Sequence, residues 1–135
     1  MDDTPADRRD LGLATARAFA GDELADGYLA RLGQLSPDLA DALLTNVYSD
    51  VLSRSGLTPR DRELLTLATL IALGGCNDHL RIHVELALNV GTDPQEILET
   101  LLQAAAYAGF PRALAAAAIV HDAFAARGLL RGREH

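Results

Sequence analysis

The segment LIALGGCNDHLRIHVELALNVG spans residues 70–91 and holds the strongest structural signals in the chain. An apolar run ends at Gly74 and Gly75, and a second apolar repeat then continues as far as Gly91. Glycines directly after an apolar run are typical of a helix C-terminus. Apolar residues repeated every three to four positions are typical of an amphipathic helix. The segment therefore predicts a helix, a tight turn and a second helix.

The second of these helices, expected over residues 78–90, has one apolar face. That face carries Leu80, His83, Val84, Ala87 and Leu88. The opposite face carries Arg81, Glu85 and Asn89. His83 is therefore expected to point inward, where imidazole is a candidate general acid or base because it exchanges a proton near neutral pH. The alternative is a hydrogen-bonded core histidine.

Cys76 is the single cysteine of the chain, and His79 and His83 follow it closely. A dithiol redox site needs a second cysteine three residues on, where His79 stands, so Cys76 is interpreted as a small turn residue. The two histidines are spaced to share a metal ion, with Glu63, His121 or Cys76 as a third ligand. Two ligands alone are a weak signal, and we predict no metal site.

The rest of the chain also predicts helices and no strand. Capping residues, apolar spacing and helix-ending glycines place them over residues 5–20, 22–35, 38–53, 59–73, 94–108 and 111–128. A strong start signal is Thr58 before Pro59, with Asp61 three residues after the cap. Ser36 before Pro37, and Asp93 before Pro94 with Glu96 three residues after the cap, are further start signals.

The length of 135 residues fits one all-α domain, with an ordered core of about residues 8–128 and a frayed tail at 129–135. A net charge of −7 without a basic face argues against nucleic-acid binding. No apolar stretch is long enough to span a membrane, and the polar N-terminus lacks a secretory signal. We expect a soluble, cytoplasmic protein.

Other polar residues have simple structural interpretations beside their functional ones. Glu63 lies early in a helix, where the helix dipole favours an acid. Asp50 is interpreted as a solvated acid at a helix end, and His121 as a packed core histidine. Arg112 is expected to face solvent unless an anion binds there.

Apolar residues cover nearly all sides of the helix over residues 64–73, and alanines fill residues 113–118. Together they expose more apolar surface than a small bundle can cover, which favours an oligomer.

Much of the chain resembles the carboxymuconolactone decarboxylase family, which is related to the alkyl hydroperoxidase D proteins. The resemblance rests on the segment RRDLGLATARAFAGD and on the motifs R.RELLTLA, LR.H...AL..G, EI.E.L and YAGFP, which are specific together. It implies a compact helical bundle of the alkyl hydroperoxidase D-like type that assembles as a homotrimer or homohexamer.

The resemblance also implies an activity, the decarboxylation of 4-carboxymuconolactone to a β-ketoadipate enol-lactone without a cofactor. The family's histidine and its two acids fall on His83, Glu63 and Asp50. For a small anionic lactone or keto-acid substrate, we assign binding to His79, Arg81 and Arg112. Loss of CO2 leaves charge on the lactone carbonyl, and an acid then protonates carbon.

The chain departs from the family at two positions. Redox members carry Cys-x-x-Cys-x-x-x-His, and this frame holds Cys76, His79 and His83 here. The missing thiol favours decarboxylation over hydroperoxide reduction. Leu52 stands where the family often has Trp. Alternatives are other enolate or lactone chemistry in a biosynthetic pathway, a hydroperoxidase-like antioxidant protein, and a non-catalytic oligomeric binding protein.

Overall fold

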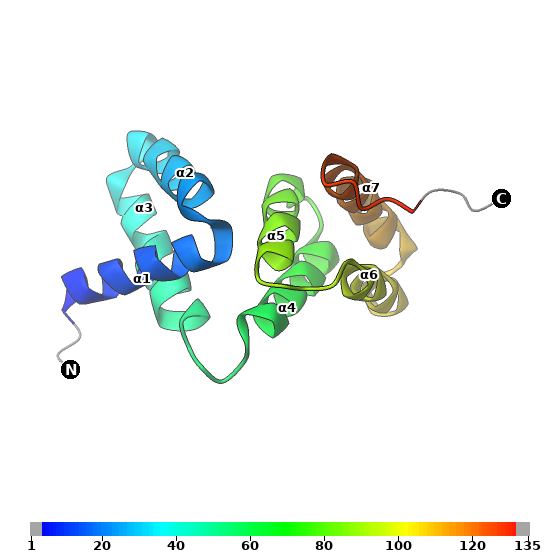
Figure 1. Cartoon of the computed structure of the whole chain (residues 1–135), viewed down its shortest axis with the longest axis horizontal. Helices are drawn as coiled ribbons and strands as arrows, with labels where there is room; N and C mark the ends of the chain where they lie inside the picture. Colours follow the sequence, from blue (N-terminus) through cyan, green and yellow to red (C-terminus); the bar gives the residue numbers. More distant parts are fainter. Residues whose placement is uncertain (1–3, 132–135) are drawn as a thin grey trace. The chain divides into compact units, whose positions relative to one another are not determined.

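The computed structural model describes residues 4–131, and within that range the chain forms helices and no strand (Figure 1). The all-α prediction is confirmed. The chain divides at Pro59 into two compact units, and the expectation of a single domain stays a prediction. Of the tail expected to fray, residues 129–131 lie outside any helix, and residues 132–135 lie outside the described residues.

The helices of the N-terminal unit are α1 (Pro5–Ala20), α2 (Asp22–Leu35), α3 (Pro37–Ala42) and the π-helix η1 (Leu43–Leu52). Side-chain caps begin two of them. The Thr4 hydroxyl accepts a hydrogen bond from the Asp7 amide, and the Ser36 hydroxyl accepts one from the Leu39 amide. The predicted bounds of α1 and α2 agree with the structure.

The continuous helix expected over residues 38–53 is not a single α-helix, because its second part is η1. The expectation rested on Leu39, Leu43, Val47 and Val51, a strict four-residue spacing. Three of these side chains are exposed, and the buried positions are instead Ala40, Leu44 and Ser49. The step of five between Leu44 and Ser49 matches the i to i+5 repeat of a π-helix, which an α-helical pattern misses.

Helix α1 crosses η1 at very close range because Gly12 has no side chain. A Cβ atom at Gly12 would lie 2.2 Å from the Leu44 carbonyl oxygen, which is far inside contact distance. Ala16, Ala25 and Leu44 form the small core of this unit.

The C-terminal unit holds α4, which begins at the dividing residue (Pro59–Leu73), followed by α5 (Asn77–Asn89), α6 (Pro94–Ala108) and α7 (Phe110–Ala126). The predicted start of α6 is confirmed. The Asp93 side chain accepts a hydrogen bond from the Gln95 amide, and the Glu96 side chain accepts one from the Asp93 amide.

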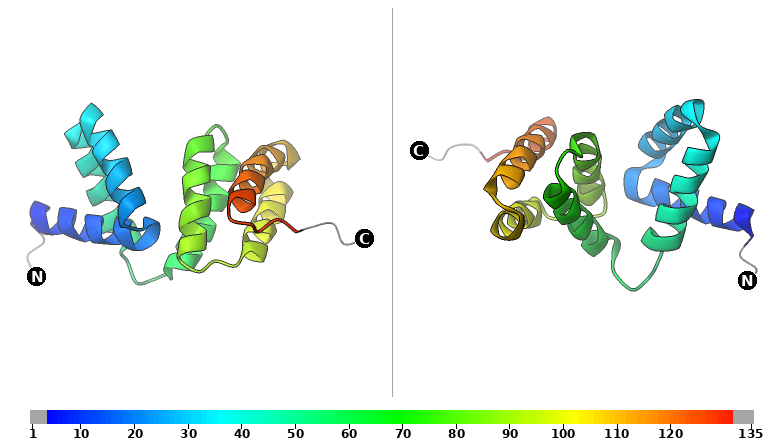
Figure 2. Two further views of the ribbon diagram at one scale, coloured as in Figure 1. Left: turned by 45° about the horizontal axis from the view of Figure 1, so that its top comes forward. Right: turned by 180° about the vertical axis from the view of Figure 1, so that it is seen from behind.

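One apolar core joins the four helices of the C-terminal unit, with Leu67, Val84, Ile97 and Val120 contributed by α4, α5, α6 and α7 in turn. Helix α7 packs against both α5 and α6, as both views of Figure 2 show. In the part of the chain that is described, no helix is long and apolar enough to cross a membrane.

Candidate active site

Helix α5 places His83 at the edge of this core. Leu80, Val84 and Ala87 of the same helix are buried, and the His83 side chain is 15% exposed. The predicted apolar face therefore agrees with the structure, and His83 lies along it. Arg81, on the opposite face, is exposed.

Helix α4 places Glu63 against His83. Glu63, Leu67 and Ile71 follow each other at four-residue spacing on one face of α4, and all three are buried. Glu63 is fully buried, and its Oε2 lies 2.9 Å from Nδ1 of His83. An acid placed only to favour the helix dipole would face solvent, so the simple interpretation of Glu63 does not explain its position.

Only one polar atom of each side chain takes part in this contact. His83 Nε2 has no hydrogen-bond partner among residues 4–131, and Glu63 Oε1 is buried without one in the same range. With Nδ1–H donated to the carboxylate, the imidazole holds one tautomer and directs Nε2 away from Glu63. In the neutral imidazole Nε2 then accepts a hydrogen bond or a proton, and in the imidazolium, with Glu63 as its counter-ion, Nε2 donates.

The structure places the other predicted catalytic acid, Asp50, in the N-terminal unit. Arg8 donates to both of its oxygens, with Nε 3.1 Å from Oδ1. The Asp50 side chain is exposed. Of the three predicted catalytic residues, the structure therefore joins Glu63 and His83, and it pairs Asp50 with Arg8.

None of the predicted substrate-binding residues has a hydrogen bond or ion pair with Glu63 or His83 among the contacts of residues 4–131. His79 and Arg81 are exposed near the start of α5, and Arg81 lies 3.7 Å from the Asp78 carboxylate. The interpretation of His121 as a packed core histidine is wrong. Its side chain is 63% exposed and lies beside Asp122.

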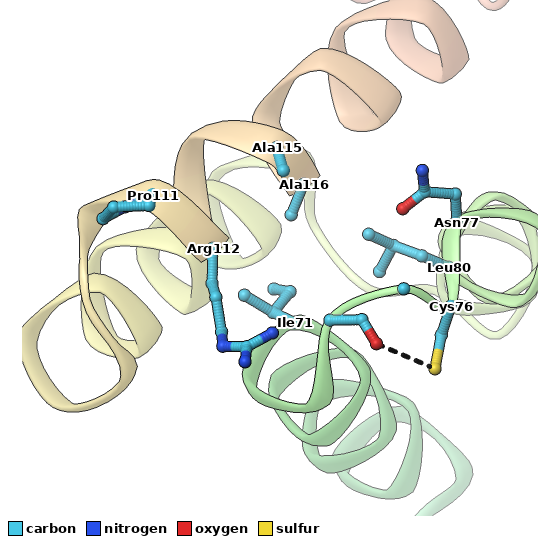
Figure 3. Close-up of a pocket in the computed structure, with 10 residues that line it drawn as sticks. Ile71, Cys76, Asn77, Leu80, Pro111, Arg112, Ala115 and Ala116 are labelled. Carbon is cyan, nitrogen blue, oxygen red and sulfur yellow. Dashed lines mark hydrogen bonds between the residues drawn. The ribbon is translucent and has the colours of Figure 1, made fainter.

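Arg112 lines a cavity of about 420 Å³ that the sequence did not predict (Figure 3). The turn between α4 and α5 and the first turns of α7 form its walls. Arg112 Nη1 donates to the Leu73 carbonyl at 2.8 Å. Cys76 also lines the cavity and is half-buried, and its Sγ lies 3.5 Å from the Gly74 carbonyl. The sequence signals that lie at this cavity are the paired glycines Gly74 and Gly75 and the segment GFPR at residues 109–112.

Neither Glu63 nor His83 is among the residues that line this cavity in the described chain. No three His, Cys, Asp or Glu side chains of residues 4–131 gather closely enough to hold a metal ion.

Residues 37–122 match the carboxymuconolactone decarboxylase family. The chain belongs to this family. The match includes Glu63 and His83 and extends from α3 into α7. The resemblance stated from the sequence is therefore confirmed, and it supports a decarboxylase-like function.

Two relatives extend the similarity over most of the chain. A 4-carboxymuconolactone decarboxylase of Acinetobacter baylyi is 30% identical over 118 residues, which cover 87% of each chain. An uncharacterized 15.0 kDa protein of Paracoccus denitrificans, from the nqo9–nqo10 intergenic region, is 29% identical over 84% of this chain and 85% of its own length. Identity of about 30% over most of both chains supports a shared fold, and it does not identify the substrate of this protein.

Proposed function

We propose that this protein is a cofactor-free decarboxylase, a carbon–carbon lyase acting on a carboxylated lactone. The substrate is 4-carboxymuconolactone or a related keto- or enol-lactone acid. The observation that carries the proposal is the contact between the fully buried Glu63 carboxylate and His83 Nδ1 at 2.9 Å. A histidine that served only as core packing, enclosed by aliphatic side chains, would not need a buried acid beside it.

The reaction needs a proton and a stabilised anion. The bond between the carboxylate carbon and the lactone ring breaks, CO2 leaves, and the electron pair moves into the conjugated lactone carbonyl to give an enolate. A donor aimed at that oxygen stabilises the charge. A proton delivered to ring carbon then completes the step.

In our proposal His83 acts as the imidazolium, whose Nε2–H supplies that hydrogen bond and then the proton, and Glu63 orients it and balances its charge. Because Nδ1 is held by the carboxylate, Nε2 is the ring nitrogen left for the substrate. His79 and Arg81, exposed on the same helix, are proposed to contact the anionic substrate. Asp50 takes no part in this scheme because Arg8 pairs with its carboxylate.

Turnover of a panel of carboxylated lactones and keto-acids, followed by CO2 release, tests the proposal. We expect His83→Gln to lower kcat by at least about a hundredfold, because a positioned acid or base contributes about 10²–10⁴-fold. His121→Gln is the matched control, since His121 is exposed on α7, and it should keep native turnover. His79→Gln should lose much less than His83→Gln. Near-native turnover by His83→Gln would show that this mechanism is wrong.

We also propose that the protein assembles as a homotrimer or homohexamer. Large apolar side chains on α6 and α7 support this, since Tyr107 is 87% exposed and Leu102, Phe110 and Leu114 are exposed as well. Large apolar side chains left exposed in this number are typical of an interface. Light scattering at micromolar concentration should give three or six times the 14.4 kDa chain mass. A monomer under those conditions would contradict the proposal.

A further inference from the structure

The cavity between the α4–α5 turn and the start of α7 has a chemistry of its own. Its volume of about 420 Å³ falls within the usual range for small-molecule sites. Its described lining does not contain the Glu63–His83 pair. The question is therefore which ligand its walls would hold.

Arg112 is fixed at one side of the cavity by backbone. Its Nη1 donates to the Leu73 carbonyl at the end of α4, at 2.8 Å. The guanidinium lies directly over Gly74, where a Cβ atom would be 1.8 Å from Nη1. Gly74 also has a φ of +68°, which L side chains rarely adopt. Glycine at this position thus serves both the turn and the placement of the guanidinium.

The remaining N–H groups of Arg112 have no acidic partner. In residues 4–131, no carboxylate lies within ion-pair distance of Arg112. Other arginines of the same unit do have such partners, namely Arg60 with Glu96, Arg81 with Asp78 and Arg127 with Glu85. Arg112 is exposed and, unlike Arg131, which the Gln95 amide holds at the surface, it lines a cavity, so its other N–H groups can reach an external anion there.

The geometry of guanidinium favours one class of anion. Its planar N–H groups match the two oxygens of a carboxylate. Apolar side chains form much of the remaining wall, with Ile71 and Leu80 buried and Ala115 and Ala116 on α7, while Asn77 adds one neutral amide (Figure 3). These walls suit a small hydrocarbon or lactone body rather than a second charged group.

We infer that this cavity binds a small carboxylic acid with an apolar body, whose carboxylate pairs with Arg112. The inference does not depend on the reaction proposed for Glu63 and His83. The acid has two conceivable sources, the substrate of that pair or a separate small ligand, and the experiment distinguishes them.

Cys76 provides a direct reporter, because it is the single cysteine of the chain and lines the cavity. The probe is 5-oxotetrahydrofuran-2-carboxylate, and its methyl ester is the matched uncharged control. The rate of Cys76 alkylation by iodoacetamide is measured by mass spectrometry as each probe is titrated. We expect the carboxylate to slow alkylation saturably and the ester to have little effect. Equal protection by the ester, or no protection by the acid, would overturn the inference.

Three variants locate the bound acid. Arg112→Gln should weaken protection by about tenfold or more, because a hydrogen bond to a charged group is lost. Arg31→Gln, which removes the same charge from an exposed site in the N-terminal unit, should not. His83→Gln should protect as the native protein does, while turnover is lost if the proposed function is right.

The opposite results are equally informative. Native protection in Arg112→Gln would overturn the inference. Loss of protection in His83→Gln would place the acid at the Glu63–His83 pair and would also overturn it. If Arg112→Gln fails to fold by circular dichroism, the acid–ester comparison on the native protein still decides. The saturated probe lacks the conjugated carbonyl that the proposed reaction needs, so 4-carboxymuconolactone is titrated as well. A substrate of the pair would protect Cys76 and also be turned over, whereas a separate ligand would protect without turnover.

Discussion

A double-mutant cycle on Glu63 and His83 would test whether the two side chains act as one unit. Glu63→Gln keeps the length of the side chain and leaves an amide oxygen for His83 Nδ1, so the hydrogen bond loses its charge and keeps its geometry. A hydrogen bond to a charged group contributes about 1.5–3 kcal/mol, and a neutral one about 0.5–1.5 kcal/mol. The difference of about 1–1.5 kcal/mol predicts a loss of roughly 5- to 15-fold in kcat/KM.

The decisive result is the double variant. His83→Gln alone should cost at least about a hundredfold. If Glu63 acts only by orienting His83, adding Glu63→Gln should cause no further loss, because residues that act as a unit are strongly non-additive. All four proteins are assayed on the same lactone acid by CO2 release. A double variant slower than His83→Gln by the full Glu63→Gln factor would refute the orienting role.

The free energies of unfolding of the same four proteins test the contact between Glu63 and His83 independently of activity. Urea unfolding should show a coupling free energy of about 1–3 kcal/mol between the two positions, because Glu63 is fully buried and His83 nearly so. Coupling in stability with purely additive losses of activity would mean that the pair is structural.

Three further predictions concern other parts of the molecule. Gly12→Ala should lower the free energy of unfolding by about 1–3 kcal/mol, because its Cβ would lie 2.2 Å from the Leu44 carbonyl oxygen. Gly27→Ala on α2, where a Cβ meets nothing within 4 Å, should instead stabilise by up to about 1 kcal/mol, and urea unfolding that gave both variants the same sign would contradict this. Cys76→Ser should keep nearly all turnover in the CO2 assay, and hydroperoxide reduction should be negligible in both the native protein and this variant. A large loss of activity in either assay would show that the thiol reacts. Protein purified without a histidine tag should contain well under one equivalent of metal by mass spectrometry, and stoichiometric zinc or nickel held by the two histidines of α5 would reverse this prediction.

Local signals predicted the helices well, because caps and helix-ending glycines act within a few residues. Ser36, Asp93 and Glu96 make the capping contacts that their spacing indicated. The face of α5 that carries His83 could be predicted for the same reason. The π-helix could not, because the four-residue spacing of its apolar side chains is typical of an α-helix, whereas the buried step of five from Leu44 to Ser49 is seen only in the structure.

The contacts of the site depend on tertiary structure and could not be predicted from spacing alone. Glu63 and His83 are 20 residues apart, and only the crossing of α4 with α5 brings them together. The same holds for Arg112 and the Leu73 carbonyl, which are 39 residues apart. His121 was misplaced for another reason. Alanines occur on several sides of α7, so the sequence does not mark which face is buried, and His121 lies on an exposed one.

The α4–α5 turn shows why proton chemistry suits this chain better than dithiol chemistry. Cys76 stands just before α5, and His79 occupies the position, three residues on, at which a dithiol site would need its second cysteine. Reduction of a hydroperoxide by a dithiol needs a second thiol to resolve the oxidised first, and this chain has a single cysteine. The buried carboxylate of Glu63 and the imidazole of His83 are in contact. Decarboxylation through an enolate requires only an oriented donor and a proton, which this pair can supply without a change in oxidation state. The contact between Glu63 and His83, together with the lack of a second thiol, is therefore the physical reason to test lactone acids before peroxides.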